Sequence, residues 1–425
     1  MIVETQATPL NSVEQPISGL IETFAGNGKA RSTGDGKLAV KAGIPLPHHV
    51  ALDREEQWLY FAESGSDRIR RVNFQTGTLH NFAGIGETCY CGDDGPCAEA
   101  GLYLPLAVAF DSLNNLYICD SGSNRIRKVD HETGIITTVV GTGQHGFNGD
   151  GPALEVNLTW PAAIAFDQDD VLYIADTQAH KVRRYDSKTG EVTTIAGTWT
   201  AEDDAREQPL VARNLVVLSG DAIGIDFSDE QGWLMPVCSD GADLSLYLDD
   251  GRPAIDARLF DIVGLAVDKK GDVYAVDKGS NRVRKIDRQT GLISTVAGVC
   301  RYGYDGDGKP AVKSMLHAPE AAVFDHEDNL YIADTMNHRV RKVDAATGII
   351  TTVAGSGDSG YEDSNMGGCG AARFVAKESA GLLKHGDGLL GVDAVVNAPT
   401  GLALDSQGRL YICERGENKI RRLNL

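Results

Sequence analysis

The sequence has no apolar run long enough to cross a membrane and no leader of the kind that directs secretion. A transmembrane helix needs about 20 consecutive apolar residues, and no stretch among the 425 residues approaches that length. The N-terminal segment MIVETQATPLNSVEQPISG lacks both the basic region and the apolar region of a signal peptide. We therefore expect a cytoplasmic protein with no membrane partner.

Basic residues are scarce relative to acidic ones. Forty lysines and arginines stand against 60 aspartates and glutamates, which gives a formal net charge of −20. Such a molecule as a whole repels nucleic acids and anionic membranes. We expect no nucleic-acid partner; a small organic substrate is the predicted partner, and a protein partner is the alternative.

Prolines are also few, since the chain has 14 of them against 49 glycines. This balance indicates many tight turns, as an all-β chain needs. Among the eight cysteines, the cluster C-Y-C-x5-C at residues 89–97 suits either a metal or a disulfide. Its spacing matches no zinc pattern, so we expect structural or free thiols there. Cys119 and Cys413, in the motif LYIC, are predicted core residues.

One segment recurs throughout the chain. LYICDSGSNRIRKVDHETGIITTVVGTG at 116–143 returns almost unchanged as LYIADTMNHRVRKVDAATGIITTVAGSG at 330–357. Each copy contains three short β-branched runs and then a fourth, such as GIITTVAG, with turn residues between them. Six clear copies lie at 50–73, 108–130, 164–186, 265–287, 322–344 and 402–424, and a degenerate seventh lies at 225–250. Four strands per repeat describe the blade of a β-propeller.

The two ends of the sequence complement each other. The last copy stops after its third strand, NKIRRLNL, while the chain opens with an isolated fourth strand, GLIETFAG, at 19–26. We predict an all-β, seven-bladed propeller of four-stranded antiparallel blades, with six blades as the alternative, in which the N-terminal strand closes the last blade. Residues 1–18 form an extension, and 19–425 form one domain with a divergent blade at about 198–262 and a long loop at 356–397.

These motifs resemble the NHL family: GDG-type loops, a proline before the inner strand, LYIAD, N-R-[IV]-R-K and TVAG. The similarity covers about residues 19–425 and implies a propeller, usually of six blades. It also implies a binding platform for proteins or RNA, or a small-molecule enzyme. The architecture is similar to propeller lyases such as streptogramin B lyase, with a histidine base and magnesium, and peptidyl-amidoglycolate lyase, with zinc held by histidines.

Two repeated charged motifs have structural interpretations. The basic run Arg125-Ile126-Arg127-Lys128 and its copies suggest nucleic-acid binding, but pairing with the aspartates of LYIAD and KVD is the better interpretation. The GDG loops could hold calcium through carboxylate and carbonyl oxygens. We expect them to be turns in which glycine adopts a positive φ.

Residues that break the repeat are the candidates for function. The first copy reads PHHVALD, and its third position is His49, beside His48, where later copies have a small residue. In the divergent copy, Asp226 replaces an inner-strand alanine. We predict that His49 is a general base, with Asp226 or Glu320 orienting it, unless these are ordinary hydrogen-bonded residues. The same atoms could hold a divalent cation such as calcium, magnesium or zinc.

Further candidate binding residues lie at the same rim or in the irregular segments. Those at the rim, besides His48, are Asp221, Asp261 and His317. The divergent copy contributes Trp233, Met235 and Tyr247, and it forms either a binding wall or a decayed repeat. The long loop contributes Tyr361 and Arg373 as a predicted lid over the rim.

The favoured function is a small-molecule enzyme that performs acid–base chemistry in the central funnel, with or without a metal. Its reaction would be of the lyase, cyclase, alkyl-transfer or hydrolase type, as in secondary metabolism. The alternative is a non-catalytic platform that binds another protein. The sequence does not name a substrate, because fold alone does not determine function.

Overall fold

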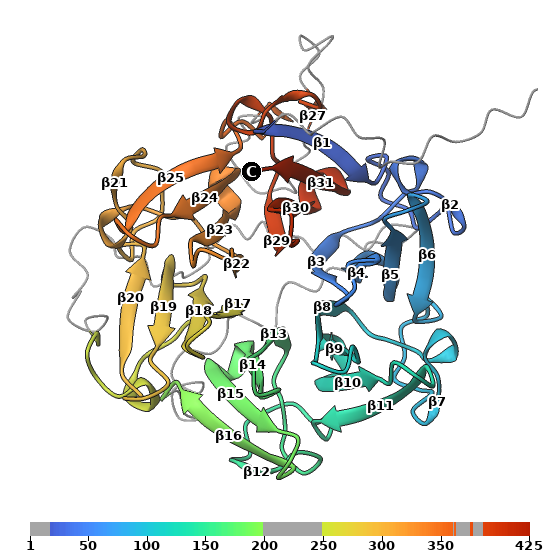
Figure 1. The fold of residues 1–425 in the computed structure, drawn as a ribbon. Coiled ribbons are helices and arrows are strands. Elements are labelled where there is room, and N and C mark those ends of the chain that lie inside the picture. Colours follow the sequence, from blue (N-terminus) through green and yellow to red (C-terminus); the bar gives the residue numbers. More distant parts are fainter. Residues whose placement is uncertain (1–17, 199–248, 360, 363–374, 377–385) are drawn as a thin grey trace, which may run out of the picture.

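The computed structural model describes residues 18–198, 249–359, 361–362, 375–376 and 386–425. Six antiparallel sheets surround a central axis, as in a β-propeller (Figure 1). A separate two-stranded ribbon pairs β26 (Tyr361–Glu362) with β27 (Val375–Ala376). Within these described residues, no helix has the length and apolar character that a membrane crossing requires.

In each sheet, or blade, the first three strands follow one another outward from the axis in chain order. The blades are numbered one to six from the N-terminal side. The innermost strands are β3 (Pro47–Leu52), β8 (Pro105–Phe110), β13 (Pro161–Phe166), β17 (Ile262–Val267), β22 (Ala321–Phe324) and β29 (Pro399–Leu404). The second strands are β4 (Trp58–Glu63), β9 (Leu116–Asp120), β14 (Leu172–Asp176), β18 (Val273–Asp277), β23 (Leu330–Asp334) and β30 (Arg409–Glu414).

The outer strands follow the same order. The third strands are β5 (Arg68–Asn73), β10 (Arg125–Val129), β15 (Lys181–Asp186), β19 (Arg282–Ile286), β24 (Arg339–Val343) and β31 (Lys419–Asn424). The fourth strands are β6 (Thr78–Ala83), β11 (Ile135–Val140), β16 (Glu191–Ala196), β20 (Ile293–Ala297), β25 (Ile349–Ala354) and, in the sixth blade, β1 (Leu20–Ala25).

Two sets of short 3₁₀ helices connect the strands. Between second and third strands lie η2 (Ser64–Ser66), η4 (Ser121–Ser123), η5 (Thr177–Ala179), η9 (Thr335–Asn337) and η11 (Arg415–Glu417). Ahead of innermost strands lie η1 (Ala39–Lys41), η3 (Cys97–Glu99), η7 (Ala254–Asp256), η8 (Ala311–Lys313) and η10 (Gly391–Asp393).

The predicted seventh blade is wrong. Strand β13 of the third blade packs directly against β17 of the fourth, and the Thr177 hydroxyl donates to the Ile262 carbonyl across that joint at 2.7 Å. A further blade therefore has no place between them. Asp249 and Asp250, the end of the degenerate copy, instead form the entry loop of the fourth blade, where both accept hydrogen bonds from Arg284. The rest of that copy lies outside the described residues.

The prediction of four strands per blade is also corrected. In five blades the loop before the innermost strand pairs with the fourth strand as a short outer strand. These fifth strands are β2 (Lys37–Leu38), β7 (Gly95–Pro96), β12 (Gly151–Pro152), β21 (Lys309–Pro310) and β28 (Leu389–Leu390). The fourth blade keeps four strands, and an isolated bridge joins Pro253 to Leu292 at the equivalent place.

The predicted closure of the ring is confirmed. β1 pairs with β31 of the last blade, with Ile21 opposite Leu423, and also with β28.

A hydrogen bond that recurs between neighbouring blades also joins the last blade to the first. The residue after each η helix of the first set has a left-handed backbone, and its side chain accepts a hydrogen bond from the next blade. Asn124 accepts from the Trp160 N–H, and Asn418 of the last blade accepts from the Leu46 N–H of the first, both at 2.9 Å.

The hydrophobic core lies between blades as well as within them. Leu59 and Phe61 of the first blade share one buried cluster with Tyr411, Cys413 and Ile420 of the sixth. Cys119 is buried in the same way between the second and third blades, so the core prediction for Cys119 and Cys413 is confirmed. A single blade would leave one apolar face exposed, and the closed ring covers both.

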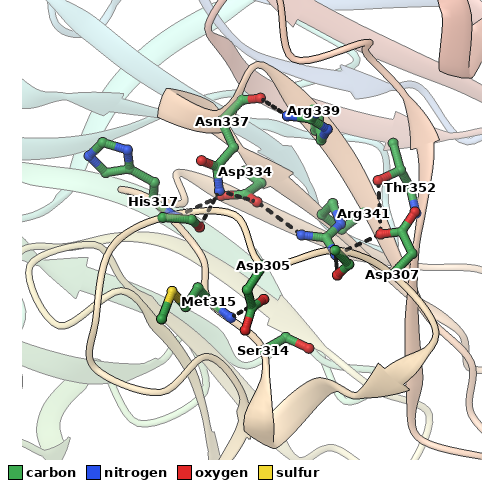
Figure 2. Close-up of polar contacts among 12 residues, drawn as sticks. Asp305, Asp307, Ser314, Met315, His317, Asp334, Asn337, Arg339, Arg341 and Thr352 are labelled. Atoms are coloured by element: carbon green, nitrogen blue, oxygen red, sulfur yellow. Dashed lines mark hydrogen bonds and ion pairs between the residues drawn. The ribbon is translucent and has the colours of Figure 1, made fainter.

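Each blade contains a fully buried arginine in its third strand that holds two parts of the blade together. In the fifth blade, Arg341 lies 3.3 Å from Asp334, at the end of the second strand, and 2.9 Å from Asp307 of the GDG loop. Asp307 in turn accepts from the Thr352 hydroxyl of the fourth strand, and Figure 2 shows this chain of contacts. The six equivalent arginines are Arg70, Arg127, Arg183, Arg284, Arg341 and Arg421.

These contacts explain both charged motifs of the repeat. The basic runs pair with the LYIAD aspartates, so the structural interpretation of Arg127 and its copies is confirmed. The GDG aspartates Asp150 and Asp307 are bound to arginines. Burial raises the pKa of Asp334 to about 6, although the hydrogen bonds from Asn337 and His317 and the charge of Arg341 oppose the rise.

Replacing one of these arginines should destabilise the ring strongly. We predict that Arg341→Met lowers the free energy of unfolding by about 3–5 kcal/mol, because it leaves a buried carboxylate without its cation. Lys313→Met, the same change at an exposed site of the same blade, is the control and should have little effect. Denaturant unfolding followed by circular dichroism measures both, and equal stabilities would contradict the role assigned to Arg341.

Candidate functional site

The innermost strands bring one special position of each blade to one end of the axis. In most blades the register between the innermost and second strands shifts just after the first residue, as at Pro105/Ala107. Bulges of this kind redirect a side chain, and they are frequent next to functional sites. The residues at this position, from the first blade to the sixth, are His48, Leu106, Ala162, Val263, Glu320 and Thr400. We call this end of the axis the mouth.

Polar residues occupy three consecutive blades at the mouth. Glu320 and His48 are separated by the whole sixth blade, yet His48 Nε2 lies 3.9 Å from Glu320 Oε2. Their side chains therefore reach toward each other across the mouth. Between them, the Thr400 hydroxyl donates to the His48 carbonyl at 3.0 Å. The other three blades present apolar side chains, so the mouth has a polar half and an apolar half.

Two basic residues that break the repeat complete the polar half. The first residue after the buried acid of the second strand is serine or threonine in four blades. Its hydroxyl donates to a backbone carbonyl at the start of an innermost strand, as Thr335 does to Pro399 at 2.7 Å. In the fourth and sixth blades this residue is Lys278 or Arg415 instead. Lys278 Nζ lies 2.9 Å and Arg415 NH2 lies 3.3 Å from Glu320 Oε1.

The charge states follow from burial and these neighbours. Burial alone would raise the pKa of Glu320, but Arg415, Lys278 and His48 outweigh it and hold the pKa at about 2. Burial lowers the pKa of His48 to about 3, with Glu320 opposing. Burial lowers that of His49 to about 4, although a hydrogen bond to the Val108 backbone raises it. At neutral pH Glu320 is therefore an ionised carboxylate, and His48 and His49 are neutral imidazoles.

His49, the neighbour of His48 in the chain, has a feature of its own. Its Nδ1 atom is buried and has no hydrogen-bond partner among the residues that the structure describes. Gly401 of the sixth blade packs against its backbone, where a Cβ would lie 2.8 Å from the His49 Cα. A neutral imidazole that donates from one nitrogen keeps the other as an acceptor, so Nδ1 is a buried acceptor whose capacity is unused.

The structure brings together only part of the predicted site. His48 and Glu320 meet, while Asp261 serves the contact between blades through its backbone N–H, 3.3 Å from His180 Nδ1. His317 donates its backbone N–H to Asp334 and its ring lies against Tyr302, directed away from the Asp334–Arg341 pair in Figure 2. The candidates outside the described residues are Asp221, Asp226, Trp233, Met235, Tyr247, Arg373 and the side chain of Tyr361. Their roles stay predictions.

Lys278 and Arg415 are the functional candidates that sequence reasoning missed. The signal was present, because D-K-G-S and E-R-G-E depart from the serine or threonine of the other four copies at this one position. A basic residue in a turn is usually a solvated side chain. Only the convergence of three blades on Glu320 distinguishes these two.

A metal at this site receives no support from the geometry. Among the described residues, no three histidine, cysteine, aspartate or glutamate side chains gather closely enough to hold an ion. Both carboxylate oxygens of Glu320 already accept hydrogen bonds from cations. The cavity of about 220 Å³ at the seam of the first and sixth blades, which Phe24, Phe74 and Arg422 help to line, is a separate feature.

Comparisons with known proteins agree with this architecture. The family model described as the teneurin NHL domain matches residues 27–150, which contain the first two blades. NHL repeat-containing protein 2 of Gallus gallus is 26% identical over 354 residues, covering 72% of this chain and 47% of its own. The chain forms a β-propeller, and its sequence is similar to these NHL-repeat proteins.

A plant protein gives a similar match to the same propeller. Protein SUPPRESSOR OF QUENCHING 1 of Arabidopsis thaliana is 26% identical over 360 residues, which cover 78% of this chain and 31% of that protein. The propeller thus spans less than half the length of these two relatives.

Solved structures share the fold at low sequence identity. An auxiliary nutrient binding protein from Bacteroides thetaiotaomicron aligns with a TM-score of 0.59 at 17% identity, over 95% of this chain and 75% of that chain. A gluconolactonase from Xanthomonas campestris aligns with a TM-score of 0.51 at 12% identity, over 99% of this chain and 95% of that chain. The distant likeness therefore includes a propeller enzyme, and at this identity it shows the fold alone.

The two histidines should make stability depend on pH in a defined direction. Their folded-state pKa values lie below the usual 6.5, so the unfolded chain binds more protons as the pH falls below that value. Stability from these groups is present above pH 6.5 and is lost as the pH falls toward 4. We predict that wild type loses up to about 1.4 kcal/mol per pH unit and per histidine in this window, relative to His48→Asn/His49→Asn.

Urea unfolding at several pH values measures this difference directly. His145→Asn controls for the loss of an exposed histidine. Parallel curves for wild type and the double variant would contradict the neutral state assigned to His48 and His49.

Proposed function

We propose that the mouth of the propeller binds a small organic molecule with one polar and one apolar side. Oxygen atoms of the ligand, such as a carboxylate, lie at Lys278 and Arg415. Its apolar part lies along the opposite half of the mouth, formed by Leu106, Ala162 and Val263.

The observation that carries this proposal is the convergence of residues that break the repeat. Lys278, Glu320 and Arg415 come from three successive blades, and both cations contact Glu320 at 2.9–3.4 Å. At the equivalent positions other blades use a hydroxyl, an apolar side chain or, in the first blade, the imidazole of His48, and they keep the same fold. The ring therefore does not need these charges.

Burying charges is costly, which argues for a purpose other than stability. Moving ions out of water costs several kcal/mol each, and their mutual attraction often only balances that cost. Perturbed carboxyl and imidazole groups in one place are typical of functional sites. The side chains of His48, Lys278 and Arg415 remain 14–17% exposed, so a small molecule can reach them.

The chemistry of the cluster defines the ligand class. A guanidinium and an ammonium recognise carboxylate, keto and hydroxyl oxygens through strong charge-assisted hydrogen bonds. Glu320, ionised at neutral pH, accepts hydrogen bonds from a ligand hydroxyl or amine. The apolar half disfavours a ligand that is charged all round, because the side chains of Leu106, Ala162 and Val263 would not solvate it.

A catalytic role for the mouth has one observation in its favour, the buried and unpartnered Nδ1 of His49. With a pKa of about 4, His49 is a weak base at neutral pH. A bound carboxylate would raise that pKa and make proton transfer effective. Acid–base chemistry on the ligand is therefore the second candidate function, and the lyase or hydrolase type stays a prediction.

Binding of simple probes tests the proposal. We predict that benzoate and hexanoate bind more tightly than benzyl alcohol and hexanol, as measured by calorimetry and ligand-observed NMR. Lys278→Ser/Arg415→Ser should weaken carboxylate binding by about tenfold or more, since each charge-assisted hydrogen bond contributes roughly 1.5–3 kcal/mol.

Lys313→Ser, at an exposed lysine, is the matched control and should leave binding unchanged. Equal affinity of the double variant and wild type, or a preference for the alcohols, would contradict the proposal. The protein-platform alternative predicts capture of a stoichiometric protein partner that the same double variant retains.

A further inference from the structure

Two cysteines in the second blade lie in direct contact near the surface. Cys89 Sγ and Cys91 Sγ are 2.8 Å apart, with Cys91 exposed and Cys89 half-buried. A disulfide needs a separation of about 2.05 Å, so the sulfur atoms are within about 1 Å of bonding. Only the tyrosine between them separates the two residues in the chain.

The same loop exists in the third and fifth blades without cysteine. Cys91 corresponds to Asn148 and Asp305, and Cys89 corresponds to a glycine in both loops. The side chain of Asn148 accepts the Asn157 N–H at 2.7 Å and thereby holds the loop. Asp305 accepts the Met315 N–H in the same way.

The second blade holds its loop by other means. The backbone carbonyl of Cys91 accepts the Gly101 N–H at 3.2 Å, and a short bridge joins the two residues. The thiol of Cys91 is therefore not used to anchor the loop. Two sulfur atoms thus stand where the repeat needs neither of them.

Gly101 provides the space for this pair. A Cβ at this position would lie 2.1 Å from Cys89 Sγ and 2.8 Å from Cys91 Sγ. The equivalent residues of the third and fifth blades, Asn157 and Met315, carry full side chains. The glycine and the two cysteines are three departures from the repeat that fit one another.

Tyr90 holds the backbone between the cysteines in place. Its ring lies 3.7 Å from the guanidinium carbon of Arg125, and its hydroxyl donates to Asp93 at 2.8 Å. Asp93 in turn pairs with the buried Arg127. The dithiol is thus attached to the rigid charged network of its blade, and a pair held at this distance loses little entropy when it closes.

We propose that Cys89 and Cys91 form a redox-active pair that closes to a disulfide by exchange with a small disulfide such as oxidised glutathione. The exposed Cys91 thiolate attacks one sulfur of glutathione disulfide and releases one glutathione, which takes up a proton. Cys89 loses its proton and attacks the Cys91 sulfur, which releases the second glutathione. In total, two thiols are oxidised and one glutathione disulfide is reduced to two thiols.

The order of attack follows from the surroundings of the two thiols. The hydrogen bond to Cys91 raises the pKa of Cys89 to about 11, so Cys89 keeps its proton until the mixed disulfide has formed. Cys97, the third cysteine of this region, is buried and its thiol donates to the Phe82 carbonyl. It therefore takes no part in the exchange.

Equilibration of the unaltered protein in glutathione redox buffers tests the proposal. After acid quenching and alkylation, peptide mass spectrometry should show that Cys89 and Cys91 together lose two hydrogen atoms, while Cys97 and Cys119 remain alkylated. A disulfide between Cys91 and Cys97, or two thiols that stay reduced in glutathione disulfide alone, would overturn it.

Single variants separate a coupled pair from two independent thiols. In Cys89→Ser, Cys91 should accumulate as the mixed disulfide with glutathione, at least about tenfold above its level in wild type. Cys91→Ser should react at least about tenfold more slowly than Cys89→Ser. Equal glutathione modification of wild type and both variants would show independent cysteines and contradict the pair.

Phenylarsine oxide, which bridges neighbouring thiols, gives a second readout. Wild type should retain it through this pair, and either single variant should lose that binding. Retention by both variants would place the binding elsewhere and count against the pair.

Discussion

A buried arginine in the third strand of every blade, paired with carboxylates, is the interaction on which the ring depends. It joins the second strand to the loop that enters the blade, so that the outer and inner parts of each sheet are held together. It also explains why the repeat carries basic runs and GDG aspartates, because these residues form ion pairs with each other inside the blades. An acidic chain can thus repeat a basic motif six times without presenting a basic surface.

Because the repeat satisfies the fold, its exceptions become informative. Lys278 and Arg415 replace hydroxyl residues, and Glu320 is an acid where the other blades carry apolar residues, a threonine or a histidine, yet all three blades keep their strands and their contacts between blades. The exceptions meet at one end of the axis, where the innermost strands of the blades begin. A position shared by six blades is therefore a natural place to build a site, since one substitution in each blade supplies a different chemical group at the same radius.

Much of this fold could be read from the sequence, and the failures have physical causes. The strands and the closing N-terminal strand follow from periodicity and from the unmatched ends of the repeat. The blade count failed because Asp249 and Asp250 belong to the entry loop of the fourth blade, although they end a segment of repeat length. The contact of His48 with Glu320 joins blades two apart, which no local pattern encodes. Lys278 and Arg415 were overlooked because the hydroxyl that they replace binds a carbonyl of the next blade, a contact that appears only in three dimensions. The absence of membrane and nucleic-acid partners stays a prediction from charge and composition.

The central claim is that the charges at the mouth serve a ligand and not the ring. The most direct measurement is the free energy of unfolding of Lys278→Ser/Glu320→Ala/Arg415→Ser, which restores at each position a residue that another blade carries. The account predicts a stability equal to that of wild type within about 1 kcal/mol, or higher, because a buried ion cluster is replaced as a whole. A loss of several kcal/mol would show that the cluster is part of the framework and would contradict the account.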